Sequence, residues 1–359
     1  MSNKIRILMR VVLTSGAVAL AACSNPTDAT QAARFNTTQV EAGVATVNRV
    51  AETPVLTSVL AMSQFVGAAA RPRTSDELVG AGGSLQDAVA RLATTVLTSG
   101  TAMLPLMHHD VLGKTFVYDE ATARYQVDPS RTGAPANGVR FILYETDANK
   151  RPIVARPIGY ADLTDEQRAS PSAIGLKFVV VTDGVTRLTY LLNVTGSLSD
   201  PVFDVSGYLS DGTDRVDFTI TANPRFFGNS APATVDATLR VPGTSFSVTA
   251  HAVGIPGAPR GDGTIALTIT SATDRIQVAS TVAAGVLDAT FTVNGAVFAT
   301  ATGNPEAPVI RGKDGQELTA DELRALGAVV DLAGHIFTMI ADLLQPVGAL
   351  LVIALGITG

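Results

Sequence analysis

Apolar and polar residues alternate along most of the chain between Lys114 and Ala301. A period of two is typical of β-strands, in which successive side chains point to opposite faces of a sheet. The clearest example lies between Val185 and Thr195. There the apolar set is Leu188, Tyr190, Leu192 and Val194, and the polar set is Arg187, Thr189 and Asn193. This stretch predicts a half-buried antiparallel strand.

Turn signals divide the alternating region into roughly a dozen strands. Asp183-Gly184 and Asn294-Gly295 are dipeptides typical of tight β-hairpins. A proline interrupts Ile153–Ile158, which favours an edge strand, and the polar stretch Tyr160–Pro171 predicts a loop or short helical turn. We expect residues 113–303 to form a large antiparallel β-meander, built as a curved sheet, a sandwich or a partial barrel.

Helical spacing precedes the meander. Apolar residues recur three and four apart from Thr38 onward, and Thr53-Pro54 resembles the start of a second helix that continues to about Val66. Ser84 with Asp87 resembles a capping box that opens another helix. Residues 36–112 are therefore expected to form a helical N-terminal segment that packs on the sheet.

A long apolar helix is expected near the C-terminus, within residues 319–357. Thr319 and Glu322 form a capping box, and apolar residues then follow at helical spacing from Ala320 to Leu344. A membrane-spanning helix is the alternative, but Asp331, His335 and Asp342 interrupt the first part and the remainder is shorter than a span. The predicted class is thus α+β, with this helix covering the apolar face of the sheet.

Composition narrows the functions that the chain can have. It has 359 residues, of which 46% are hydrophobic and 16% charged, enough to bury a sizeable core. Aromatic residues make up 5% and tryptophan is absent, which disfavours a stacking platform for bases or sugars. The formal net charge of -6 disfavours a nucleic-acid partner.

The N-terminus has the anatomy of an export signal. Basic residues at Lys4, Arg6 and Arg10 precede an apolar segment, Val11–Leu20, that is too short to span a membrane. Small residues follow, up to the single cysteine of the chain, Cys23. We therefore expect a signal peptide over residues 1–22 and, from the small polar residues behind it, a flexible tether over residues 23–35.

The sequence Leu20-Ala21-Ala22-Cys23 resembles the lipobox of bacterial lipoproteins. The resemblance covers only the first 23 residues. It implies cleavage before Cys23 and acylation of that cysteine, which would anchor the body to a membrane through two or three acyl chains. In that class, a residue other than aspartate after the cysteine, here Ser24, implies delivery to the outer membrane. The alternative is an ordinary secretory signal with a chance cysteine at the cleavage site.

Three polar groups could carry chemistry, and each has a simpler interpretation. His108-His109-Asp110 offers metal ligands but lacks the spacing of a known metal motif, so an exposed turn is favoured. Asp211, Asp214 and Asp217 surround a glycine-containing turn that could hold calcium, although the EF-hand pattern is absent and a polar hairpin is favoured.

The third group is the polar seam formed by Asp331, His335 and Asp342 on the predicted C-terminal helix. A carboxylate four residues from an imidazole could orient it for acid–base chemistry. No nucleophile motif such as GxSxG accompanies the seam, so a solvated polar stripe is favoured. We expect no enzyme activity, no metal and no cofactor.

Two functions from different classes remain. The first is a structural or interaction lipoprotein with a packed core and a threonine-rich exterior that meets a protein partner. The second is a carrier for a lipid or another hydrophobic ligand between sheet and helix. In its ingredients the body resembles periplasmic lipid-handling lipoproteins of the LolA and LppX type, without any residue diagnostic of that class. Free volume between the sheet and the helix would favour the carrier.

Overall fold

The computed structural model describes residues 37–67, 107, 109–166, 174–197, 200–223, 233–254, 262–305 and 307–320, and separate positions between 322 and 346. Those positions are 322–324, 326, 327, 329–331, 333, 336, 339, 343 and 346. The chain divides into two compact units. Unit 1 contains Thr46–Gly228 and the residues from Thr338 onward, and unit 2 contains Asn229–Phe337 and the helical residues up to Ala45.

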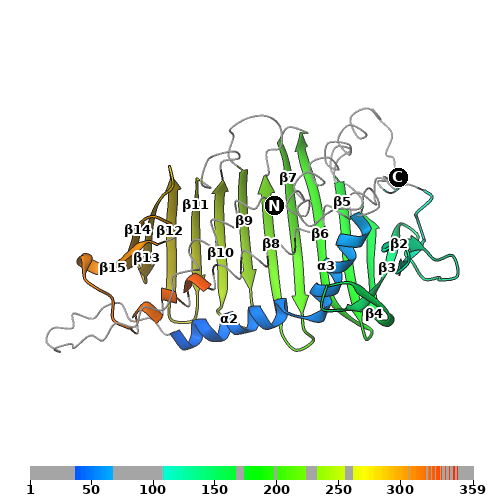
Figure 1. Cartoon of the computed structure of the whole chain (residues 1–359), viewed down its shortest axis with the longest axis horizontal. Coiled ribbons are helices and arrows are strands. Elements are labelled where there is room, and N and C mark those ends of the chain that lie inside the picture. Colours follow the sequence, from blue (N-terminus) through cyan, green and yellow to red (C-terminus); the bar gives the residue numbers. More distant parts are fainter. Residues whose placement is uncertain are drawn as a thin grey trace. The chain divides into compact units, whose positions relative to one another are not determined.

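Unit 1 contains eight of the described strands, one whole helix and the C-terminal residues of another (Figure 1). The helices are α2 (Thr37–Ala51), whose first residues belong to unit 2, and α3 (Pro54–Gly67). The strands are β1 (Thr115–Asp119), β2 (Arg124–Val127), β3 (Gly138–Thr146), β4 (Pro152–Asp165), β5 (Ile174–Thr182), β6 (Val185–Ser197), β7 (Asp200–Ser210) and β8 (Arg215–Asn223).

The strands of unit 1 form a mixed sheet in the order β8-β7-β6-β5-β4-β3-β1-β2. From β3 to β8 each strand pairs antiparallel with the next one in the sequence, as the predicted meander requires. The β1–β2 hairpin departs from this pattern, because β1 pairs parallel with β3. The fully antiparallel prediction is therefore wrong at this end of the sheet.

One face of this sheet carries a continuous apolar layer. Phe178 in β5 is opposite Tyr190 in β6, Tyr190 is opposite Gly207 in β7, and Gly207 is opposite Phe218 in β8. The rows on either side are aliphatic and equally buried. They are Val180, Leu188, Leu209 and Val216 on one side, and Leu176, Leu192, Val205 and Ile220 on the other.

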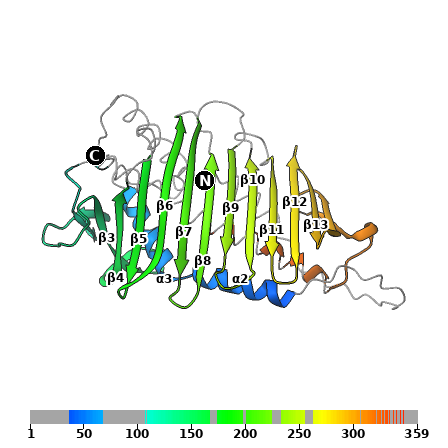
Figure 2. The ribbon, with the colours of Figure 1, turned by 180° about the vertical axis from the view of Figure 1, so that it is seen from behind.

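Helix α3 packs on one face of unit 1. It lies in front of the strands in Figure 1 and behind them in Figure 2, and it contacts β2, β3 and β4. The Ser58 hydroxyl donates a hydrogen bond to the backbone oxygen of Tyr144 at 2.8 Å, and the Phe65 ring lies edge-on to Tyr118. The predicted second helix is confirmed, since it begins at Pro54 and ends one residue beyond Val66.

Unit 2 contains the remaining seven strands, in the order β15-β14-β13-β12-β11-β10-β9. All of the pairings within it are antiparallel. The strands are β9 (Ala233–Arg240), β10 (Ser247–Gly254), β11 (Gly263–Thr270), β12 (Arg275–Ala283), β13 (Val286–Val293), β14 (Ala296–Gly303) and β15 (Val309–Gly312).

The predicted tight hairpins are confirmed by their backbone angles. Asp183 and Gly184 between β5 and β6 have φ values of 51° and 73°, and Asn294 and Gly295 between β13 and β14 have 51° and 83°. Positive φ at both central residues is the geometry that matches the right-handed twist of the two strands.

The two faces of unit 2 differ in chemistry. Leu239, Val248, Ile269, Ile276 and Val293 form one buried row across five strands. The opposite face is rich in threonines that are exposed or half-exposed. They are Thr234, Thr238, Thr249, Thr264, Thr268, Thr270, Thr281, Thr290, Thr292, Thr300 and Thr302.

Two strand predictions are corrected. The segment expected as the edge strand Ile153–Ile158 followed by a loop is the interior strand β4, which extends to Asp165 between β3 and β5. The sheet accommodates Pro157 because the β3–β4 register shifts beside it. The described residues form fifteen strands rather than about a dozen, including β15, which is only four residues long.

The long C-terminal helix is not supported as a continuous element. The described positions between 322 and 346 have helical backbone, but they are separated by residues outside the described part of the chain. Several of these positions are buried, namely Leu326, Val329, Ile336, Met339 and Leu343. Among the described residues, no helix is both long and apolar enough to cross a membrane.

Candidate functional site

The lipobox residues Leu20, Ala21, Ala22 and Cys23 lie outside the described residues, so the predicted cleavage and acylation remain predictions. The same holds for His335 and Asp342 of the polar seam. Asp331, the third member of the seam, is described and its side chain is exposed. The favoured interpretation of the seam as a solvated stripe therefore stays untested.

The His108-His109-Asp110 segment can be followed only in part, because His108 lies outside the described residues. The Nε2 atom of His109 lies 2.9 Å from Oδ1 of Asp110, and both side chains are largely exposed. Among the residues that the structure describes, no group of three or more histidine, cysteine and acidic side chains is arranged to hold a metal ion.

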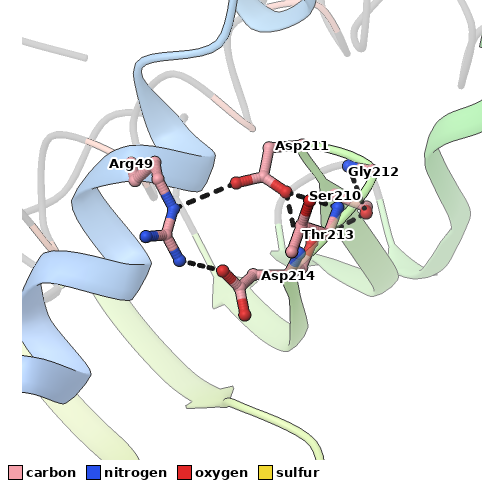
Figure 3. A network of polar contacts seen from close by, with 6 residues as sticks. All are labelled: Arg49, Ser210, Asp211, Gly212, Thr213 and Asp214. Carbon is pink, nitrogen blue, oxygen red and sulfur yellow. Dashed lines mark hydrogen bonds and ion pairs between the residues drawn. The ribbon is translucent and has the colours of Figure 1, made fainter.

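The acidic turn between β7 and β8 is organised by Asp211. Its Oδ1 atom accepts hydrogen bonds from the backbone N–H groups of Thr213 and Asp214, both at 2.7 Å. Gly212 supplies the positive φ, 101°, that the turn requires. The turn therefore holds the carboxylates of Asp211 and Asp214 side by side (Figure 3).

Arg49 in helix α2 pairs with both of these carboxylates. Its Nε donates to Oδ2 of Asp211 at 3.1 Å, and its Nη2 donates to Oδ2 of Asp214 (Figure 3). Asp217, the third carboxylate of the candidate calcium site, pairs instead with Arg215. The carboxylates that could have bound calcium are thus paired with guanidinium groups, which fits the predicted polar hairpin.

His251 and Asp236 form a pair across β9 and β10 on the threonine-rich face of unit 2. The two residues are directly opposite in the register, and His251 Nδ1 lies 2.6 Å from Asp236 Oδ1. Both side chains are about half exposed. His251 and Asp236 are 15 residues apart, so strand register is needed to bring the two side chains together.

The Tyr190 side chain is the polar exception in the apolar layer of unit 1. Its ring packs between the rings of Phe178, at a centroid distance of 5.2 Å, and Phe218, at 6.5 Å. Leu188 and Leu192 flank it on the same face of β6, and both are 1% exposed. Tyr190 itself is 2% exposed.

The Tyr190 hydroxyl is buried and has no hydrogen-bond partner in the structure, and the same is true of the buried Thr53 and Thr115 hydroxyls. Burial raises the pKa of Tyr190, so the hydroxyl is uncharged at neutral pH and can both donate and accept a hydrogen bond. A buried hydroxyl without a partner costs about 1–3 kcal/mol. A phenylalanine would avoid that cost, so the hydroxyl calls for an explanation.

Sequence reasoning placed Tyr190 on the apolar side of its strand but did not single it out. Tyrosine is common in strands and in cores, and its hydroxyl usually finds a partner there. Only the three-dimensional structure reveals that this one has none.

Comparison with known proteins adds no functional assignment. No protein-family model matches the chain. No curated protein and no solved structure is significantly similar to it.

Proposed function

We propose that this chain is an exported lipoprotein of the bacterial cell envelope, anchored by lipid at Cys23, with a structural or interaction role. The observation that carries the proposal is the sequence Leu20-Ala21-Ala22-Cys23 behind a basic and an apolar segment. Because Ser24 follows the cysteine, the outer membrane, facing the periplasm, is the proposed location.

Two features of the body support a structural or interaction role. Both units contain an extensive buried apolar layer, which is expected of a rigid, well-packed body. The threonine-rich face of unit 2 is accessible to solvent and nearly free of lysine, which makes it a candidate surface for a protein partner.

Membrane fractionation of cells that express the full-length chain tests the anchor. The Cys23→Ala variant should leave the membrane fraction, because acyl chains at this thiol are the strong anchor that the proposal supplies. Ser24→Ala, next to it in the sequence, is the matched control and should stay membrane-bound. Retention of the Cys23→Ala variant through high-salt and carbonate washes would disprove lipid anchoring.

A second candidate function is a carrier for a lipid or another hydrophobic ligand. The observation that favours it is the buried Tyr190 hydroxyl without a partner, within an otherwise apolar layer. Hydrophobic ligands are typically held by apolar surfaces with a small number of placed polar groups. Native mass spectrometry of the protein purified from cells would detect a bound ligand as added mass.

A further inference from the structure

Strand β2 is the end strand of unit 1, and its outer edge is open. Among the described strands it pairs only with β1 (Figure 1). Just beyond β2, the Asp128 N–H group donates to the Thr115 backbone oxygen at 2.9 Å. Residue pairs in an antiparallel ladder alternate between hydrogen-bonded and non-bonded, so Tyr125 and Val127 direct their N–H and C=O groups away from β1. No described residue forms a hydrogen bond with these outward groups.

The end strand of unit 2 is protected at its edge, in contrast to β2. Pro308 precedes β15, and the Gly312 N–H group donates to the Gln316 backbone oxygen at 2.8 Å. Prolines and covering segments of this kind keep sheet edges from pairing with other chains. Strand β2 contains neither proline nor lysine, and Val127 is 41% exposed. The β2 edge is therefore available to another strand.

We infer that β2 pairs antiparallel with β2 of a second copy of this chain, across a two-fold axis beside Gln126. This register places Tyr125 of each copy opposite Val127 of the other, and each such pair exchanges two hydrogen bonds. All of the outward backbone groups of the strand then have partners. Moving the axis by one residue would pair Tyr125, or Val127, with its own counterpart and leave the other without a partner inside β2.

The charges at the two ends of β2 are complementary in this register. Arg124 of each copy lies opposite Asp128 of the other, and opposite charges at facing positions stabilise strand pairs. Arg124 has no ion pair among the described residues. Asp128 accepts hydrogen bonds from Ser130 at Oδ1 and from Arg131 at Oδ2. A carboxylate has about four acceptor positions, so Oδ2 can accept a further bond.

The expected dimer is weak and reversible. Strand β2 has four residues, and such an edge covers less area than the roughly 1,200–2,000 Å² of a stable interface. The inference goes beyond the proposed function and does not depend on the lipid anchor, because the pairing involves only β2 and Asp128.

Sedimentation velocity over a range of concentrations tests the association. The full-length chain carries Cys23→Ala, so that acyl chains at that position do not contribute. We expect a monomer–dimer equilibrium, and dimerisation at least about tenfold weaker in the Arg124→Glu variant, because two attractive charge pairs become repulsive. Arg156→Glu is the matched control. It makes the same change of charge at an exposed residue of β4 and should leave dimerisation unchanged.

Disulfide cross-linking tests the register. Cys23 is the single cysteine of the chain, so the Cys23→Ala protein has no other thiol. Gln126→Cys places two thiols at facing, non-bonded positions with Cα atoms about 4.5 Å apart, within the range of a disulfide. Oxidation should convert this variant to a covalent dimer. In Val127→Cys the two Cα atoms would be about 8 Å apart, too far for a disulfide, so this control should stay largely monomeric.

Three results would overturn the inference. The first is a chain that stays monomeric up to about 1 mM. The second is a dimer that Arg124→Glu leaves as tight as the parent. The third is cross-linking of Val127→Cys as complete as that of Gln126→Cys, which would show a different register or surface. Thermal melting checks that each variant is folded. If Arg124→Glu does not melt cooperatively, the two cysteine variants, which keep both charges, decide.

Discussion

Gly43 in α2 lies directly against the ring of Phe246, at the loop that leads into β10. A β-carbon at position 43 would overlap the Cγ, Cδ2 and Cε2 atoms of that ring. Phe246 is buried, and its backbone is held by hydrogen bonds to Val241 and Thr244. The close approach of helix and ring therefore requires a residue without a side chain at position 43.

We predict that Gly43→Ala destabilises the protein by about 1–3 kcal/mol, the usual cost of overpacking a core. Gly327→Ala is the matched control, because Gly327 also has helical backbone and a β-carbon there would meet nothing within 4 Å. Alanine should stabilise that position by about 0.5–1 kcal/mol. Urea denaturation measures both changes, and equal effects at the two positions would contradict the packing argument.

The Arg49 ion pairs should contribute little to stability. The Arg49 side chain is 58% exposed, and exposed ion pairs contribute about 0–1 kcal/mol. Asp211→Ala should cost more, about 1–2 kcal/mol, because its carboxylate also accepts two backbone N–H groups of the turn. Asp211→Asn keeps an acceptor for the turn and should resemble Arg49→Ala. A larger loss for Arg49→Ala than for Asp211→Ala in urea denaturation would refute this ranking.

Stability should fall at alkaline pH because of buried tyrosines. Burial raises the pKa of Tyr118, Tyr125, Tyr144 and Tyr190 above the ordinary value of 10.0. Above about pH 10 the unfolded chain loses these protons while the folded chain keeps them, so the free energy of unfolding decreases as the pH rises. The stabilising effect is fully present below that pH.

Urea denaturation between pH 8 and pH 11, with tyrosinate absorbance recorded in parallel, measures this effect. A free energy of unfolding that stays constant over the range would argue against protected tyrosines. The Tyr190→Phe variant should show a shallower decline than the parent, because one protected proton is removed.

Much of the sheet follows from local sequence signals. The alternation in β6 and the hairpin turns at Asp183-Gly184 and Asn294-Gly295 each depend on residues that are neighbours in the sequence, so a local pattern predicts each of them. Strand β4 departs from the local prediction, because Pro157 is typical of an edge strand and the polar residues behind it are typical of a loop. Asp162 is stable in an interior strand because Arg140 in the neighbouring β3 binds both of its carboxylate oxygens, at 2.7 and 2.8 Å.

Contacts between distant residues could not be predicted in the same way. Arg49 and Asp211 are 162 residues apart, and nothing near either one indicates the pairing. The parallel contact between β1 and β3 likewise depends on where the β1–β2 hairpin docks. Whether the Tyr190 hydroxyl has a hydrogen-bond partner depends on every residue that packs near it in the folded chain. The sequence pattern predicts only which face of the strand Tyr190 is on.

The buried positions near the C-terminus lead to the last prediction. Ile336 is fully buried, whereas Leu323 in the same segment is 47% exposed. Ile336→Ala should cost about 2–5 kcal/mol, since it leaves a cavity, and Leu323→Ala should cost less than about 0.5 kcal/mol.

A truncation after Gly315 removes several buried apolar side chains, each worth about 1.5–3 kcal/mol, and should give an insoluble or molten protein. If the truncated chain instead purifies as a monomer with a cooperative melt, the segment is an appendage whose apolar residues serve a partner or a membrane.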